Sequence, residues 1–277
     1  FDFDPNTFRP SNSMEAAGSI AENKVTALAA GEKRELWVGT INGLVHSVDG
    51  MIPTVVHVPD GLTGEHITAL YRDANGVLWA GSSNAGISRI EHGKASPLQL
   101  GAPFTPTCFA EDGQGRLWVG TEGRGILVLK DRRQVASYST EQGLISNAVR
   151  SLITDRAKHV WIGTNRGLNE WQPDKDHFIR YSARSGFTGI EAKPNSAILT
   201  GNGDLWFGTA NGAVCVGPTK DMNRVVPPTV AIRGLKVNLE NRSPKPGIDL
   251  SHTESNIRLE YGSVSLSDPE AVRYQYY

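Results

Sequence analysis

The stretch Leu117-Trp-Val-Gly-Thr121 decides the fold of this chain, because four close copies of it occur elsewhere in the 277 residues. Successive tryptophans of the five copies are 42, 39, 43 and 45 residues apart. A period of about forty residues is typical of β-propeller blades, in which each repeat forms one small sheet. The sequence therefore predicts an all-β fold built from consecutive propeller blades. The five copies are Leu36–Thr40, Leu78–Ser82, Leu117–Thr121, Val160–Thr164 and Leu205–Thr209.

The second repeat shows how one blade is built. Its turn sequences, Asp73-Ala-Asn-Gly76 and Asn84-Ala-Gly86, separate short apolar runs, a pattern that favours antiparallel hairpins. Four short strands result, which is the arrangement of a propeller blade. They are expected at 67–71, 77–82, 87–90 and 96–100. The inner strands of the five repeats are expected at 25–30, 67–71, 107–111, 149–154 and 195–200.

Within the repeated phrase, successive side chains point to opposite faces of the strand. Trp118 and Gly120 share one face, while Leu117 and Val119 share the other. Because the strand is apolar at successive positions, both faces should be buried against neighbouring blades. A glycine beside the indole leaves room for the adjoining blade to come close. We therefore expect all five tryptophans to be core residues rather than a carbohydrate platform.

A second, smaller domain is expected after the last repeat. The repeat pattern stops after Gly212, and Val226-Pro-Pro228 opens a segment of different character. Strand patterns follow at 229–237, 256–264 and 272–277, separated by proline and glycine turns. These features predict propeller blades over 1–217 and the start of a small, immunoglobulin-like β-sandwich over 226–277.

The Leu-Trp-x-Gly-Thr-x-x-Gly phrase at this period resembles the two-component regulator propeller repeat. The strand after Pro227-Pro228 and the terminal Arg273-Tyr-Gln-Tyr-Tyr277 resemble the opening part of the three-Y domain that follows such propellers. The resemblance covers nearly the whole chain. It implies the periplasmic sensing region of a bacterial two-component receptor. In such receptors a membrane helix and a histidine kinase, or sometimes a diguanylate cyclase, follow the three-Y domain.

The number of repeats departs from the family pattern. Relatives usually carry seven blades in one propeller, whereas five phrases are visible here. One interpretation is that the chain is a fragment whose preceding blades lie upstream of residue 1. The other makes Phe1–Phe8 the fourth strand of the last blade, which would close a ring of five. An open array would expose two apolar blade faces, so we expect a homodimer held by propeller or three-Y contacts.

Composition narrows the function class. The 28 Lys and Arg balance the 29 Asp and Glu, and no long basic block occurs, so a nucleic-acid partner is not expected. No run approaches the length of a membrane span, and the first residues lack signal-peptide features, so any export signal would lie upstream. Cys108 and Cys215 occupy non-matching places in different repeats, and two free, buried thiols are expected.

No catalytic constellation is apparent in the sequence. The seven histidines show no His-x-x-x-His spacing, so neither a metal site nor a cofactor is expected. Asp73, Asp112 and Asp155 recur at the first turn of three repeats. They lack the dense oxygen ligands of a calcium loop, so turn formation explains them better.

If a ligand binds, the loops that lead into the inner strands should hold it, together with the second turns, because both gather on one rim. Their mixture of charges and amides suits a small polar ligand, and the family resemblance suggests an oligosaccharide. The alternatives are a propeller enzyme, a lyase or a glycan-active protein, with its site in the central channel, and a scaffold that binds no ligand. The rim candidates are Glu65, His66, Arg124, Asn147, Arg150, Arg166, Glu191, Lys193 and Asn195.

Overall fold

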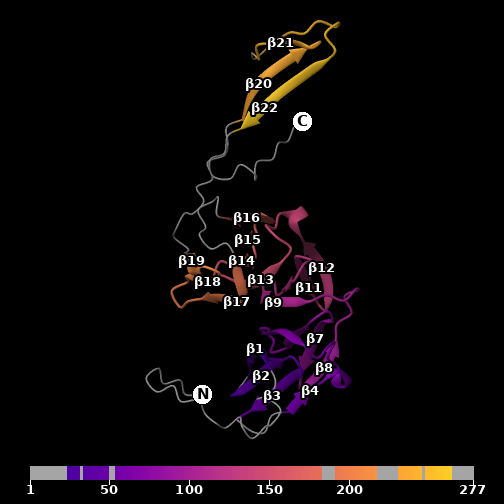
Figure 1. The fold of residues 1–277 in the computed structure, drawn as a ribbon, viewed down its shortest axis with the longest axis vertical. Coiled ribbons are helices and arrows are strands. Elements are labelled where there is room, and N and C mark those ends of the chain that lie inside the picture. Colours follow the sequence, from indigo (N-terminus) through magenta and orange to yellow (C-terminus); the bar gives the residue numbers. More distant parts are fainter. Residues whose placement is uncertain are drawn as a thin grey trace. The chain divides into compact units, whose positions relative to one another are not determined.

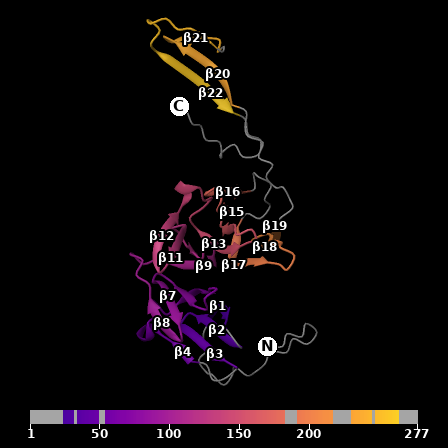
Figure 2. The same cartoon turned by 180° about the vertical axis from the view of Figure 1, so that it is seen from behind.

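The computed structural model of this chain describes residues 24–31, 34–49, 54–182, 191–216, 230–244 and 247–263. These residues form two compact units, and the first unit holds the described residues up to 216. In the first unit five antiparallel sheets follow one another along the chain, coloured from indigo to orange in Figures 1 and 2. The fold is the predicted series of propeller blades.

Blades 1 to 4 each have four strands in sequence order. Blade 1 comprises β1 (Val25–Ala30), β2 (Glu35–Thr40), β3 (Gly43–Val48) and β4 (Thr54–Val56). Blade 2 comprises β5 (Ile67–Arg72), β6 (Leu78–Ser82), β7 (Gly86–Glu91) and β8 (Lys94–Pro97). Blade 3 comprises β9 (Pro106–Glu111), β10 (Leu117–Thr121), β11 (Ile126–Lys130) and β12 (Arg133–Tyr138). Blade 4 comprises β13 (Val149–Thr154), β14 (Val160–Thr164), β15 (Gly167–Gln172) and β16 (His177–Tyr181). Short 3₁₀ turns at η2 (Val58–Asp60) and η3 (Thr140–Gln142) follow blades 1 and 3.

Blade 5 has three described strands, β17 (Ala192–Leu199), β18 (Leu205–Thr209) and β19 (Gly212–Val216). The second unit is a sheet in the order β21-β20-β22, made of β20 (Val230–Val237), β21 (Glu240–Arg242) and β22 (Ile257–Ser263). The strands expected at 229–237 and 256–264 are therefore present. Phe1–Phe8 and the strand expected at 272–277 lie outside the described residues, so the closing strand and the three-Y identity remain predictions.

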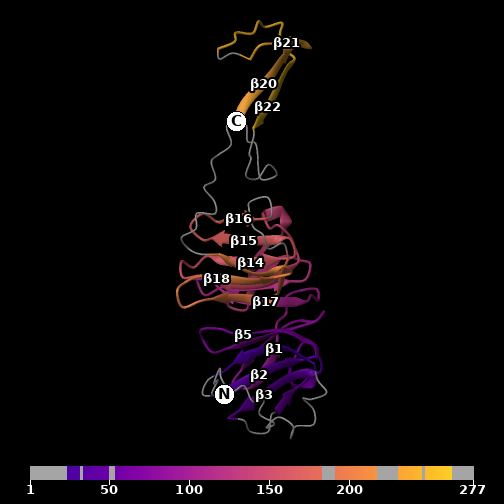
Figure 3. The same ribbon diagram turned by 60° about the vertical axis from the view of Figure 1, so that its left-hand side comes forward.

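The inner strands of consecutive blades contact one another, from β1 through β5, β9 and β13 to β17. Figure 3 shows β1 beside β5 and β14 beside β17 and β18. Hydroxyl groups link these inner strands across the blade junctions. Thr68 Oγ1 donates to the carbonyl of Pro106 at 2.6 Å, and Thr107 Oγ1 donates to that of Val149 at 2.8 Å.

One packing rule governs the blade junctions. In blades 1 to 4 the tryptophan face meets the opposite face of the next blade, where the two aliphatic or aromatic residues that flank the next tryptophan lie. For blades 2 to 4 this confirms that both faces predicted from the phrase are buried. Trp37 packs with Leu78 and Ala80, Trp79 with Leu117 and Val119, Trp118 with Val160 and Ile162, and Trp161 with Phe207.

The phrase glycines let the next inner strand approach. A Cβ atom at Gly39 would lie 2.6 Å from Ile67 Cγ2, and one at Gly81 would lie 2.7 Å from Pro106 Cβ. At Gly163 the corresponding distance to Ala192 Cβ is 2.8 Å. Each atom so approached belongs to the first strand of the following blade, so the glycine is required by blade packing.

The phrase threonines hold the second turn in blades 1, 3, 4 and 5, whereas Ser82 of blade 2 donates to the carbonyl of Gly64. Thr121 Oγ1 donates to the carbonyl of Gly125 at 2.8 Å and accepts from the backbone N–H of Arg124 at 2.9 Å. Thr40, Thr164 and Thr209 make the same pair of bonds. Because these hydroxyls satisfy turn groups that would otherwise be unpaired, every position of the phrase has a structural role.

An aspartate braces the tryptophan in blades 2 to 4. Asp112 Oδ1 accepts from the backbone N–H groups of Gln114 and Arg116, and Oδ2 accepts from Trp118 Nε1 at 2.8 Å. Asp73 and Asp155 reach Trp79 Nε1 and Trp161 Nε1 in the same way, each at 2.9 Å. The aspartates thus form turns, as expected, and they also fix the indole orientation. Burial alone would raise the pKa of Asp112, but the hydrogen bonds from Trp118 and Arg116 outweigh it and hold the pKa below its usual value.

We expect Asp112→Asn to lower the free energy of unfolding by about 2 kcal/mol near neutral pH. The substitution replaces one carboxylate oxygen, which accepts two hydrogen bonds, with an NH₂ group that cannot accept them. The folded-state pKa is lowered, so the carboxylate contributes stability above the unfolded-state pKa of about 4. That contribution disappears as the pH falls through the folded-state pKa, so the variant should lose less stability on acidification than the parent chain. Urea unfolding at a series of pH values checks this. Asp174→Asn, at an exposed position, is the control. Equal losses of unfolding free energy in the two variants would show that the hydrogen bonds of Asp112 do not stabilise the fold.

The two ends of the blade array differ from its interior. Trp206 of blade 5 is 40% exposed, whereas the tryptophans of the other four phrases are at most 7% exposed. The expectation that all five tryptophans are core residues is therefore wrong for Trp206, because no described blade covers its face. The same open face exposes Cys215, which corrects the expectation of two buried thiols. Cys108 is free and buried as expected.

Within the described residues, no helix is long and apolar enough to span a membrane. The same residues contain no group of three or more His, Cys, Asp and Glu side chains placed to hold a metal ion.

Candidate functional site: a cleft between blades 2 and 3

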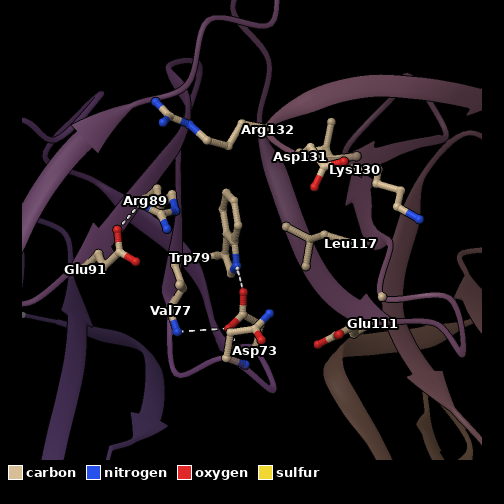
Figure 4. Close-up of a pocket in the computed structure, with 13 residues that line it drawn as sticks. Asp73, Val77, Trp79, Arg89, Glu91, Glu111, Leu117, Lys130, Asp131 and Arg132 are labelled. Atoms are coloured by element: carbon tan, nitrogen blue, oxygen red, sulfur yellow. Dashed lines mark hydrogen bonds and ion pairs between the residues drawn. The ribbon is translucent and has the colours of Figure 1, made fainter.

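A cleft of about 450 Å³ opens between blades 2 and 3 (Figure 4). It lies between the first and third turns of the two blades. Because the strands are antiparallel, these turns lie at the strand ends opposite to the second turns and to the loops that enter the inner strands. The lining residues are Asp73, Asn75, Val77, Trp79, Arg89, Glu91, Glu111, Gly115, Leu117, Leu129, Lys130, Asp131 and Arg132.

The floor of the cleft is apolar and belongs to the blade junction. Trp79 from β6 stands in the middle of the view, with its indole nitrogen directed to Asp73 and its other end toward Arg132 (Figure 4). Leu117 and Leu129 from blade 3 belong to the same buried cluster as Trp79. The brace that fixes the indole therefore also fixes the floor.

Charged groups line both walls. On the blade 2 side, Arg89 forms an ion pair with Glu91, and this hydrogen bond lowers the pKa of Glu91. On the blade 3 side, the turn between β11 and β12 presents Lys130, Asp131 and Arg132 (Figure 4). Among the described residues neither Lys130 nor Arg132 has an ion-pair partner. Two cations are thus available beside an apolar floor.

A hydrogen bond between a side chain and a backbone group joins the two walls. Glu111 Oε2 of blade 3 accepts a hydrogen bond from the backbone N–H of Ala74 in blade 2 at 3.1 Å. Nearby, burial and the charges of Glu111 and Asp73 raise the pKa of Tyr71 to about 12, so its phenol stays neutral at physiological pH. The hydrogen bond from Ala74 to Glu111 therefore links blades 2 and 3 at this end of the cleft.

The neighbouring junctions differ in the size of one side chain. Between blades 1 and 2 a cleft of about 310 Å³ is lined by Glu35, Trp37 and residues of the blade 2 turns. At the junction of blades 3 and 4, Arg116 occupies the position that Val77 has in blade 2. Its guanidinium lies 5.1 Å from the centroid of the Trp171 ring and binds Asp112. The position two before the phrase tryptophan therefore holds Val77 where it lines the larger cleft and Arg116 where it packs on Trp171.

The nine rim residues predicted from the sequence line neither of these two clefts. The structure places them at the starts of inner strands and in second turns, as expected, and several contact the connections between blades. Glu65 Oε2 lies 2.9 Å from His57 Nδ1, and Asn147 Oδ1 accepts from the backbone N–H of Thr140. Glu191 and Lys193 form one pair at 3.6 Å.

The arginines of this rim behave differently from one another. Arg124 donates to the carbonyls of Ala102 and Pro103 and lies over the ring of Phe104, so its guanidinium holds a loop. Arg166 is exposed and Arg150 is half-buried, and His66 and Asn195 are exposed. No bound molecule tests these nine positions, and they remain predictions.

The family model described as "two component regulator propeller" matches residues 61–84, 101–123 and 143–166. These segments contain the loops that enter blades 2, 3 and 4, and each ends within the second turn of its blade. Blades 2 to 4 carry two-component regulator propeller repeats. The match confirms the resemblance that the repeated phrase indicated.

A histidine kinase and a solved extracellular domain are also similar to this chain. The chain is 23% identical over 260 residues to Histidine kinase P4 of Formosa agariphila, covering 87% of this chain and 19% of that protein. It is also similar to the solved extracellular domain of the putative hybrid two-component system BT3049 from B. thetaiotaomicron. That similarity has a TM-score of 0.66 at 18% identity and covers 87% of this chain and 35% of the other. The chain thus spans about a fifth of the kinase relative and about a third of that domain.

The same fold occurs in an enzyme. Virginiamycin B lyase from Staphylococcus aureus matches with a TM-score of 0.54 at 15% identity, over 71% of each chain. At this level of identity the likeness shows the propeller fold alone.

Proposed function

We propose that this chain is a ligand-sensing part of a two-component receptor, exposed outside the cytoplasm and free of catalytic activity of its own. The observation that carries the proposal is the presence of two-component regulator propeller repeats on a fold shared with the extracellular domain of a hybrid two-component system. The output module would be a histidine kinase, as in the curated relative.

We place the ligand site in the cleft between blades 2 and 3. It combines a volume of about 450 Å³ with an apolar floor and polar walls, which is the usual character of a small-ligand site. The rim residues offer charges but line neither this cleft nor the one between blades 1 and 2.

The ligand class that suits this cleft is an oligosaccharide. Sugar rings present many hydroxyl groups, which match the mixed donors and acceptors of the walls. Lys130 and Arg132 can donate to hydroxyl or carboxylate oxygens, while the charge of Arg132 also acts on Glu91 in the opposite wall. Binding would couple blades 2 and 3 and bias the packing of the array, which supplies a signal for the output module.

The expected result is that oligosaccharides from a library of neutral and uronic-acid glycans raise the melting temperature of this chain. The double variant Lys130→Ala/Arg132→Ala should bind the best of them at least about tenfold more weakly by calorimetry, because charged hydrogen bonds are lost. Arg133→Ala is the matched control, since Arg133 is exposed next to the cleft but does not line it.

Arg166→Ala tests the opposite rim in the same assay. If Arg166→Ala weakens binding and the double variant does not, the site lies on the rim and the cleft assignment is wrong. If no glycan in the library changes the melting temperature, the oligosaccharide class is rejected.

A further inference from the structure

Two clefts lie on the same rim of the array, one on each side of blade 2. The larger cleft, of about 450 Å³, lies between blades 2 and 3, and the smaller cleft, of about 310 Å³, lies between blades 1 and 2. Three residues of blade 2, Asn75, Val77 and Glu91, line both clefts. Figure 4 shows Val77 and Glu91 on the blade 2 side of the larger cleft. The first and third turns of blade 2 therefore form a common wall between the two clefts.

The smaller cleft repeats the construction of the larger one. Leu117 and Leu129, which pair across β10 and β11, line the larger cleft. Leu78 and Ile90, which pair at the same positions across β6 and β7, line the smaller cleft. Equivalent positions of consecutive repeats thus contribute to consecutive clefts.

The third turn of the following blade completes each cleft. In the larger cleft this turn supplies residues 130–132 of blade 3, and in the smaller cleft it supplies residues 91–93 of blade 2. The middle residues of the two turns, Asp131 and His92, have φ angles of 49° and 50°. The two turns therefore share this backbone conformation and differ in the side chains that they present.

We propose that one linear oligosaccharide occupies both clefts, with neighbouring parts of its chain on either side of the blade 2 turns. This inference rests on the proposed function and adds a second subsite to it. Because the clefts are built from the same positions of consecutive repeats, they offer a chain of repeating units two sites of the same construction. A chain that reaches both gains affinity, since its second binding step is intramolecular.

The common wall suits a ligand that crosses it. Asn75 and Glu91 are exposed, so the wall between the clefts is accessible from solvent. The backbone N–H of Asn75 donates to Asp73 Oδ1 at 3.0 Å, which anchors the turn. The Asn75 side chain carries hydrogen-bond donors and an acceptor. A sugar unit above this turn would therefore meet an amide that can pair with hydroxyl groups.

The test is calorimetry with linear oligosaccharides of a neutral and a uronic-acid series, each from the monosaccharide to the hexasaccharide. Affinity should rise at least about tenfold between chains that fill one cleft and chains that reach both. His92→Asn removes an imidazole that lines the smaller cleft and not the larger one, and asparagine tolerates the positive φ of this residue. This variant should bind short chains like the unmodified protein and long chains about threefold more weakly, the effect of one lost hydrogen bond.

His177→Asn is the matched control, because His177 is exposed and lines neither cleft. Unchanged binding of short chains shows that the His92→Asn variant is folded. An affinity that does not increase with chain length, or a His92→Asn variant that binds long chains as tightly as the control, would overturn the second subsite and leave the proposed function intact. If no oligosaccharide of either series binds, the proposed function fails and this inference fails with it.

Discussion

Trp118→Ala is expected to lower the free energy of unfolding by about 3–5 kcal/mol, the range for removing a fully buried large aromatic side chain. Trp118 is completely buried, and its ring lies 5.5 Å from that of Tyr138 and 4.9 Å from that of Trp171. Truncation would leave a cavity at the junction of blades 3 and 4. It would also remove the donor that Asp112 binds.

The matched control is Trp206→Ala, which changes the same position of the same phrase in blade 5. Because Trp206 is 40% exposed, its truncation should lower the free energy of unfolding by about 1 kcal/mol. Both values come from urea unfolding followed by circular dichroism, at a concentration where the chain is monomeric. Equal losses at the two positions would show that the phrase tryptophan acts within its blade rather than across the junction.

Gly120→Val is the second substitution with a large expected effect, about 3 kcal/mol of lost stability from overpacking. A Cβ atom at this position would lie 2.5 Å from Cys108 Sγ and 2.7 Å from Val149 Cγ1. Val149 belongs to β13, so blades 3 and 4 would have to separate. Valine favours strands, so the loss cannot come from strand propensity.

Gly208→Val is the control for this substitution. Around Gly208 the close atoms are those of Ser196, in the same blade, and a Cβ would lie 2.9 Å from Ser196 Cβ. The expected loss is about half of that at Gly120, because no following blade must move. Thermal and urea unfolding of the two variants measure the difference. A Gly120 variant that is as stable as the Gly208 variant would contradict the role assigned to the glycine.

Much of the fold could be predicted from the repeated phrase. Its alternation of side chains determines which residue meets the next blade, and the glycine is required for a reason that depends only on that alternation. The hydrogen bond that Trp118 donates to Asp112 was not predicted. A signal for it was present, because an aspartate precedes the tryptophan by six residues in three repeats. The short strand β21 (Glu240–Arg242) was missed because it is wholly polar.

The cleft could not be predicted from the sequence. Its lining comes from turns of two blades that are separated in the sequence, and local patterns do not show which turns meet. The position two before the phrase tryptophan holds Val77 in blade 2, which lines the cleft, and Arg116 in blade 3, which lies over Trp171. The exposure of Trp206 is equally invisible to local sequence, because it reflects the absence of a described neighbour rather than any change in the phrase.

The common junction has a consequence for how such arrays change during evolution. Because every junction joins the same two kinds of face, the duplication or deletion of one whole repeat leaves each remaining junction with a compatible partner. A break inside a repeat would instead divide a sheet. Residues at the turns, such as Lys130 and Arg132, take no part in this shared packing. The side chains at the turns of one junction can therefore change by mutation while the packing of the blades stays the same.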